Sequence, residues 1–214
     1  KTVNGFGSGT GEEILVISGQ SPDWPTQVVL LNAEGKVLGE YWHSGRILDY
    51  EVGDTDGDGR KELILSGTNN EYKRGMIVFF DPENMGGASP NTGEFYNAAL
   101  GRGTEKAYIL LPSTDIDPID PARDWLSFAV DLELRESGWI YVLTKENQIY
   151  FEIDPRTLDC RSVGFSNAFR AYHKAAVEAG RVSSVLDDAY LEKLRTSVEY
   201  WTGSEWTTTP SWIR

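Results

Sequence analysis

The sequence predicts a mainly β fold, made of β-propeller-like blades with two C-terminal α-helices packed on the β part. Short apolar segments rich in β-branched and aromatic residues recur between glycine-, asparagine- and aspartate-containing turns. Part of this pattern repeats after 49 residues, an interval typical of propeller blades. We expect about three blade-like units, at 12–60, 61–124 and 125–165. Closed propellers typically need about four or more blades, so some blades are irregular, or the chain belongs to a longer one, or the units form an open sandwich.

The expected strands are short and follow one another closely. Turn-forming residues bound them; Asn32-Ala33-Glu34-Gly35, for example, reads as the corner of a hairpin. The strands are expected at 14–18, 27–31, 36–42, 47–52, 63–66, 76–80, 107–111, 126–132, 139–143, 149–153 and 160–163.

Two stretches interrupt the series of strands. Residues 82–104 are rich in glycine, asparagine and proline and are expected to form a long surface loop. Residues 112–123 form a second irregular piece. Loops of this length are uncommon unless they cover or bind something, and a disordered excursion is the alternative.

Helical periodicity begins after residue 165. Ser166 is the expected cap of a helix that runs to about Ala179 and stops at Gly180. Asp187 is the expected cap of a second helix, and a threonine-rich tail predicts a terminal β-hairpin. We therefore divide the chain into a β region, 1–165, and a helical segment, 166–214, packed on the same domain. The expected core-facing residues are Phe169, Tyr172, His173, Ala176 and Val177 in the first helix, and Tyr190, Leu191, Leu194 and Val198 in the second.

Two pairs of segments resemble each other. Gly11–Gly19 resembles Arg60–Gly67, with Glu13 matching Glu62. Asp81-Pro82-Glu83-Asn84-Met85 resembles Asp154-Pro155-Arg156-Thr157-Leu158, and each segment ends an apolar strand. Repeated units of several strands favour blades.

One motif carries recognisable chemistry. Asp54, Asp56 and Asp58 alternate with small or polar residues, and glycines follow two of them. Ca²⁺ takes about six to eight oxygen ligands, and glycine allows the positive φ angles that wrap a chain around an ion. The backbone carbonyl of Arg60 and the carboxylate of Glu62 would complete the site. An acidic turn that binds nothing is the alternative.

The spacing distinguishes two types of calcium loop. An EF-hand needs its closing glutamate at the twelfth position, which is Leu65 here, and helices on both sides. Closure at the ninth position between strands resembles the loops of FG-GAP (VCBS) repeats, found in integrin α-subunits and bacterial surface proteins. The match is specific over Ile47–Gly67. The resemblance implies a propeller-like fold, a structural Ca²⁺ and an extracytoplasmic setting, whether periplasmic, cell-surface or secreted.

Charge limits the class of partner. The net charge is −13, from 33 acidic and 20 basic side chains. Such a surface repels phosphate backbones, so we expect no nucleic-acid partner. No apolar run is long enough for a membrane span.

These observations favour a non-catalytic, calcium-stabilised binding or scaffold domain, with an unidentified protein or glycan as ligand and a possible place in a larger sensor or adhesion protein. The first alternative is a carbohydrate-active enzyme, a polysaccharide lyase or glycosidase. A purely structural assembly module is the second alternative. An enzyme needs convergent side chains in one pocket, and the crowded candidates are Glu105, Lys106, Asp115, Asp117 and Asp120.

Three other residues invite functional interpretations. The single cysteine, Cys160, is expected to be a buried packing residue. His173 is expected to pack on its helix face, and His43 is a candidate for a binding surface. Most of the seven tryptophans are expected in the core.

Overall fold

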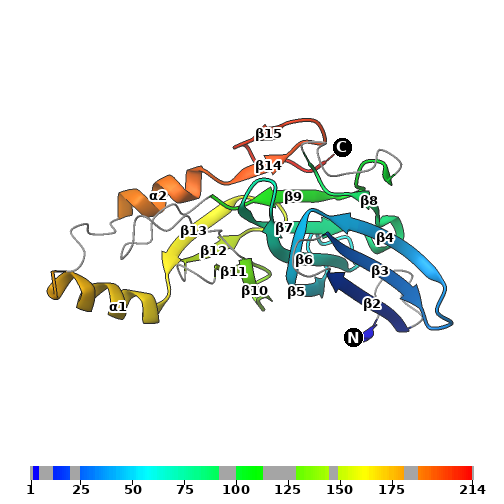
Figure 1. Cartoon of the computed structure of the whole chain (residues 1–214), viewed down its shortest axis with the longest axis horizontal. Coiled ribbons are helices and arrows are strands. Elements are labelled where there is room, and N and C mark those ends of the chain that lie inside the picture. The colour runs from blue at the N-terminus through cyan, green and yellow to red at the C-terminus, as the bar shows by residue number, and fades with distance from the viewer. Residues whose placement is uncertain are drawn as a thin grey trace.

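The computed structural model describes residues 2–4, 12–19, 25–91, 100–112, 129–144, 149–180 and 188–213. Its strands form three sheets, which we call the first, the central and the third sheet; they lie in succession from right to left in Figure 1. The two α-helices lie at the end occupied by the third sheet. None of the helices in the described ranges is long and apolar enough to span a membrane.

The first sheet consists of β1 (Thr2–Asn4), β2 (Glu12–Gly19), β3 (Thr26–Asn32), β4 (Val37–His43) and β8 (Gly86–Ala88). The first four strands are consecutive antiparallel neighbours, and β8 joins β4 in parallel. The hairpin predicted at Asn32–Gly35 is confirmed: the amide of Gly35 donates to the carbonyl of Asn32 at 2.9 Å. Gly35 has a φ of +81°, which glycine adopts without steric cost.

The central sheet consists of β5 (Gly45–Gly53), β6 (Glu62–Asn69), β7 (Arg74–Phe80), β9 (Ala107–Leu110), β14 (Glu199–Trp201) and β15 (Trp206–Thr207). Its order is β15-β14-β9-β7-β6-β5, with every pair antiparallel. Every residue of β6 is buried, because other sheets cover both faces of this one. The predicted C-terminal hairpin is β14–β15.

The third sheet consists of β10 (Ala129–Leu134), β11 (Ile140–Thr144), β12 (Ile149–Ile153) and β13 (Cys160–Phe165), in chain order and antiparallel. The helices α1 (Asn167–Glu178) and α2 (Asp188–Thr196) follow it. As predicted, Ser166 caps α1 by accepting a hydrogen bond from the amide of Phe169 at 3.2 Å. Gly180, with a φ of +67°, follows the end of α1.

Two hydrophobic clusters hold the three sheets together. The cluster between the first and central sheets includes Leu15, Val28, Leu63, Val78 and Leu110. The cluster between the central and third sheets also receives the helices; it includes Ile77, Phe79, Val142, Phe151, Phe169, Leu194 and Val198. Val177, expected in the core, is exposed instead, and the side chains of Tyr172 and His173 lie outside the described part.

Each sheet contains a four-stranded antiparallel meander: β1 to β4, then β5-β6-β7-β9, then β10 to β13. Glu13 and Glu62 each lie on the second strand of a meander, and Asp81 and Asp154 each follow the third. The expected boundary at residue 60 is wrong by one strand, because β5 pairs with β6 across the acidic turn. No strand pairing within the described ranges joins the first sheet to the third, and the propeller-like arrangement of the three meanders stays a prediction.

The surface loop expected at 82–104 is also wrong in part. A 3₁₀ turn, η1 (Pro82–Asn84), and strand β8 occupy its first third, and Ala88 and Ser89 are buried. A Cβ on Gly87 would lie 2.0 Å from the carbonyl oxygen of Arg102, so glycine is needed for this close approach. Two predicted segments lie largely or partly outside the described residues. They are nearly all of the irregular piece at 112–123, with Asp115, Asp117 and Asp120, and the first residues of the strand expected at 126–132.

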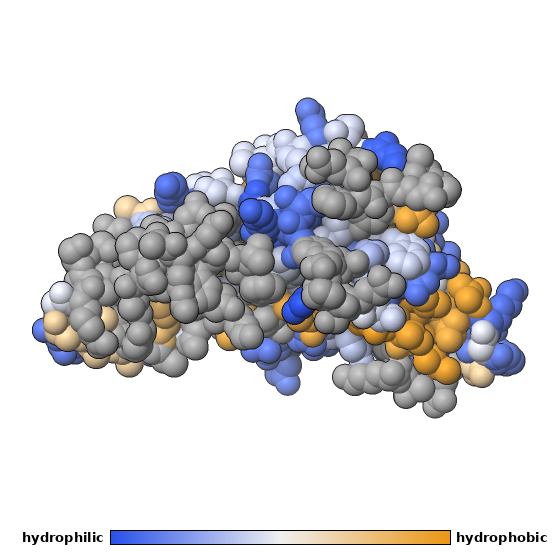
Figure 2. All heavy atoms as spheres, viewed as in Figure 1, coloured by the Kyte–Doolittle hydropathy of each residue, from blue (hydrophilic) through white to orange (hydrophobic). Residues whose placement is uncertain are grey.

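The space-filling view shows where apolar side chains reach the surface. Hydrophobic atoms gather over the first sheet, at the right of Figure 2. The exposed residues of this sheet include Val16, Val37 and Leu38. The first sheet therefore contributes residues to the core and also leaves apolar side chains at the surface.

Candidate metal centre

The acidic motif forms the turn between β5 and β6. The last strand pair, Gly53 with Glu62, closes the hairpin, and residues 54–61 project from it. Gly57 and Gly59 have φ angles of +84° and +88°. These left-handed conformations explain why glycine follows Asp56 and Asp58 in the sequence.

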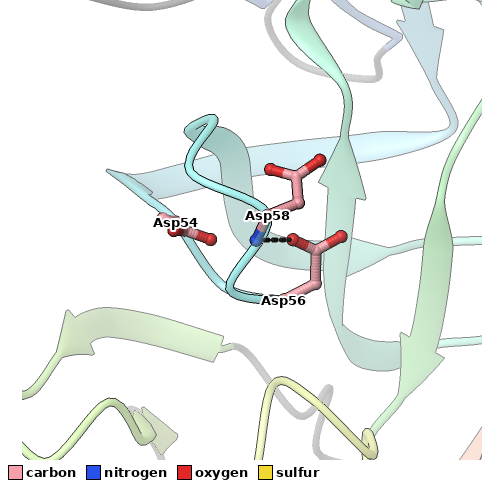
Figure 3. A group of neighbouring side chains, drawn as sticks. All are labelled: Asp54, Asp56 and Asp58. Carbon is pink, nitrogen blue, oxygen red and sulfur yellow. Dashed lines mark hydrogen bonds between the residues drawn. The ribbon is translucent and has the colours of Figure 1, made fainter.

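Three carboxylates lie close together in this turn; Figure 3 shows those of Asp56 and Asp58 near each other, with Asp54 across the turn from them. Asp54, Asp56 and Asp58 each offer one oxygen atom, and these atoms lie within 4.8 Å of one another. Asp54 accepts hydrogen bonds from the amides of Gly57 and Gly59, at 2.7 and 3.0 Å. The amide of Asp58 donates to Oδ1 of Asp56 at 3.1 Å. The backbone is thus folded around its own carboxylates.

Arg60 contributes to the charge balance at the outer side of the turn. Its amide and Nε both donate to Asp58, at 2.8 and 3.1 Å, and its Nη1 lies 3.6 Å from Glu83. The hydrogen bond from the Arg60 amide is the main cause that lowers the pKa of Asp58 below its ordinary value. Asp58 therefore stays ionised over a wide pH range, as a metal ligand must.

Glu62, the fifth predicted ligand, lies outside the three-carboxylate group. It is fully buried beneath the turn, where one carboxylate oxygen accepts hydrogen bonds from the amide and hydroxyl of Thr55 at 2.7 and 2.6 Å. The other oxygen accepts one from Lys106 at 3.2 Å. In this arrangement Glu62 fixes the base of the turn rather than facing the three aspartates.

Sequence reasoning missed the role of Lys106 beside this turn. Its Nζ donates to Asp56 at 2.7 Å and to Glu62 and Asp81 at 3.2 Å each. Partial burial alone would lower the pKa of Lys106, but the three acidic partners raise it above its ordinary value. The chain thus supplies an internal cation that neutralises part of the turn, and Asp56 is shared between this cation and the three-aspartate group.

The comparisons with known proteins add no relative. The chain matches no protein-family model, and it is similar to no curated protein and no solved structure. The likeness to FG-GAP repeats therefore stays a prediction from the turn sequence.

The residues proposed for an enzyme site are separated where the structure describes them. Glu105 is buried, accepts a hydrogen bond from the hydroxyl of Tyr41 at 2.7 Å and lines a cavity. The neighbouring side chain, Lys106, points to the acidic turn instead. Glu105 and Lys106 therefore do not act on one substrate atom as a pair.

Cys160 and His43 are both buried. Cys160 lies in the core as predicted, and burial raises the pKa of its thiol to about 12. The suggestion that His43 belongs to a binding surface is wrong, because its side chain is fully buried and Nε2 lies 3.1 Å from the carbonyl of Thr68. Burial lowers the pKa of His43 to about 4. Both side chains are therefore packing residues near neutral pH.

Proposed function

We propose that the chain is a non-catalytic binding or scaffold domain whose β5–β6 turn binds one structural Ca²⁺ through Asp54, Asp56 and Asp58. The observation that carries the proposal is the convergence of three carboxylates within 4.8 Å on a tight hairpin turn. Carboxylate oxygens are the donors that hard divalent cations prefer. The ion would neutralise charges that otherwise repel one another.

The donor set fits calcium as a structural ion. The glycine amides orient Asp54 within the turn, and each carboxylate oxygen has a second lone pair that an ion could use. Lys106 occupies one oxygen of Asp56 and would limit the affinity. A site of this kind is useful where calcium is plentiful, which agrees with an extracytoplasmic setting as the FG-GAP resemblance implies.

A binding role suits the chain better than glycoside hydrolysis. Glycosidases generally place two carboxyl groups about 5–10 Å apart on either side of the scissile bond. Among the described residues that line the cavity, Glu105 is the single acidic one. One carboxyl group can orient a ligand, but it leaves the second role of a hydrolytic pair unfilled.

The calcium proposal is tested by thermal unfolding with calcium and with a chelator. Calcium at about 100 times its Kd should stabilise the fold by about 2.7 kcal/mol, a rise of about 5–10 °C in Tm for a chain of this length. Magnesium should give a much smaller rise, because it demands a smaller octahedral site.

A pair of matched variants locates the effect. Asp58→Asn removes one carboxylate of the turn and should abolish the calcium response. Glu34→Gln removes one negative charge from an exposed residue in another turn and should keep it. An unchanged Tm in wild-type protein on chelation, or an equal response in both variants, would contradict the proposal.

A further inference from the structure

A cavity of about 540 Å³ lies where the end of β8, residues 101–105 and the β14–β15 turn meet. Small-ligand sites commonly have volumes of about 300–1,000 Å³. This one contains both hydrogen-bonding groups and an aromatic ring. Its lining includes Ser89, Asn91, Arg102, Glu105, Trp201 and Ser204.

Glu105 is a buried polar group held in a fixed position. Its residue is 4% exposed, and the hydroxyl of Tyr41 donates to Oε1 at 2.7 Å. The carboxyl group lies against Gly103, where a Cβ would come within 2.4 Å of three of its atoms. Glycine at 103 therefore leaves the space that this buried carboxyl group occupies.

The charges in the cavity favour a neutral ligand. Burial raises the pKa of Glu105 to about 7, against the lowering effects of the Tyr41 hydrogen bond and the charge of Arg102. The ionised form of Glu105 would repel an anion, and Arg102 would repel a cation. A ligand with many hydroxyl groups can hydrogen-bond to Glu105 in either protonation state, because a hydroxyl both donates and accepts, and it can accept from the guanidinium of Arg102.

Trp201 gives the cavity a braced aromatic wall. Its ring lies 5.1 Å from that of Trp206, which in turn contacts Tyr72 at 5.2 Å and Tyr108 at 5.9 Å between ring centroids. Rings packed in this way lose little entropy when a ligand binds. The apolar C–H face of a sugar ring can pack on such a surface while its hydroxyls bind the polar side chains.

We propose that this cavity binds a neutral mono- or disaccharide, with Trp201 against the sugar ring and Glu105 and Arg102 bonded to its hydroxyl groups. The inference rests on the proposed binding role and names its ligand class and site, but it does not depend on the calcium ion. The cavity and the acidic turn use different residues.

Saccharide binding is measured by saturation-transfer NMR and tryptophan fluorescence. The probes are glucose, galactose, mannose, N-acetylglucosamine, maltose, cellobiose and lactose, with glucuronic acid and glucosamine as charged comparisons. At least one neutral sugar should bind with a Kd of about 1 mM or tighter. Trp201→Ala and Glu105→Gln should each weaken it by about tenfold or more, which corresponds to about 1.4 kcal/mol.

Further variants separate loss of the site from loss of the fold. Ser204→Arg fills the cavity from an exposed turn residue and should block binding without unfolding. Trp139→Ala, at a half-buried tryptophan that does not line the cavity, should leave binding unchanged. Chelating calcium should also leave it unchanged, so the calcium site and the saccharide site fail or hold independently.

Several outcomes would overturn the inference. They are the absence of binding by all neutral probes, equal binding by wild-type protein and Ser204→Arg, and tighter binding of either charged sugar. Hydrolysis of a bound disaccharide would support the cavity as the saccharide site and overturn the non-catalytic role.

Discussion

Replacing Lys106 by methionine tests whether an internal cation stabilises the acidic turn. The substitution keeps most of the aliphatic length and removes the ammonium group that contacts Asp56, Glu62 and Asp81. Asp56 and Asp81 retain access to water, whereas Glu62 is fully buried and would keep its Thr55 hydrogen bonds alone. The cost of the substitution therefore falls mainly on Glu62.

The structure gives the size of this cost. Removing one partner of a buried ion pair costs about 3–5 kcal/mol. The side chain of Lys106 is 19% exposed, so water weakens the attraction, and we expect a loss of about 2–3 kcal/mol. For a domain of this length, that loss lowers Tm by about 5–10 °C.

The assay is chemical and thermal unfolding in the presence of a chelator, with Lys61→Met as the matched control. Lys61 is exposed and lies in the same turn, and its replacement should change the free energy of unfolding by less than about 0.5 kcal/mol. Equal stabilities for the Lys106 and Lys61 variants would refute the role given to Lys106.

Calcium provides a second measurement on the same variant. Without Lys106, Asp56 loses its closest cation and the turn becomes more negative, so Lys106→Met should bind calcium about tenfold more tightly than wild-type protein. Titration calorimetry measures the difference. Weaker binding by the variant would show that Lys106 supports the ion rather than competing with it.

Three further predictions concern buried groups. Burial raises the pKa of Glu105 from 4.5 to about 7, so its contribution to folding stability, about 3 kcal/mol, is present below pH 4.5 and lost as pH rises through 7. In urea unfolding, Glu105→Gln should be more stable than wild-type protein at pH 8 but not at pH 4. His43 acts in the opposite direction, since its pKa is lowered from 6.5 to about 4. Its contribution to stability, about 3 kcal/mol, is present above pH 6.5 and lost as pH falls through 4. His43→Gln should therefore lose less stability than wild-type protein on acidification, and an equally steep loss in the variant would contradict the reasoning. Gly67→Ala should cost about 3 kcal/mol of stability in a denaturant titration, because its Cβ would lie 1.9 Å from the carbonyl oxygen of Arg46. Gly19→Ala is the control, because its Cβ would make an ordinary contact with the Thr26 hydroxyl at 3.6 Å. Equal costs for the two variants would contradict the reasoning.

Local sequence patterns predicted most elements of this fold. Ser166 and Gly180 bracket α1 because helix ends need a side-chain acceptor at the start and a left-handed residue after the end. The turn at 54–61 was predictable because aspartate and glycine favour tight turns and positive φ angles, whereas its Ca²⁺ stays a prediction. These signals lie within about ten residues of chain, where one segment determines its own geometry.

Contacts between distant segments were not predictable in this way. Lys106 and Asp56 are 50 positions apart in the sequence, and no pattern around either residue predicts their contact. Strand β8 begins with Gly86 and Gly87, which have no side chains to reveal an alternating pattern. The orientation of Glu62 depends on Thr55 and Lys106 together, and the spacing of the motif carries no information about Lys106.

The pairing of β14 with β9 has a consequence for synthesis of the protein. Glu199 pairs with Leu110 and Tyr200 pairs with Ile109. Arg74 stabilises the same junction by donating hydrogen bonds to Glu199 and to the carbonyls of Leu110 and Ser197. Until the C-terminal segment leaves the ribosome, β9 is an edge strand of the central sheet, whereas in the complete fold the short strand β15 is at that edge. Bare edges recruit strands from other chains, so a nascent or truncated chain ending before residue 199 should be prone to aggregate although most of its core is already made.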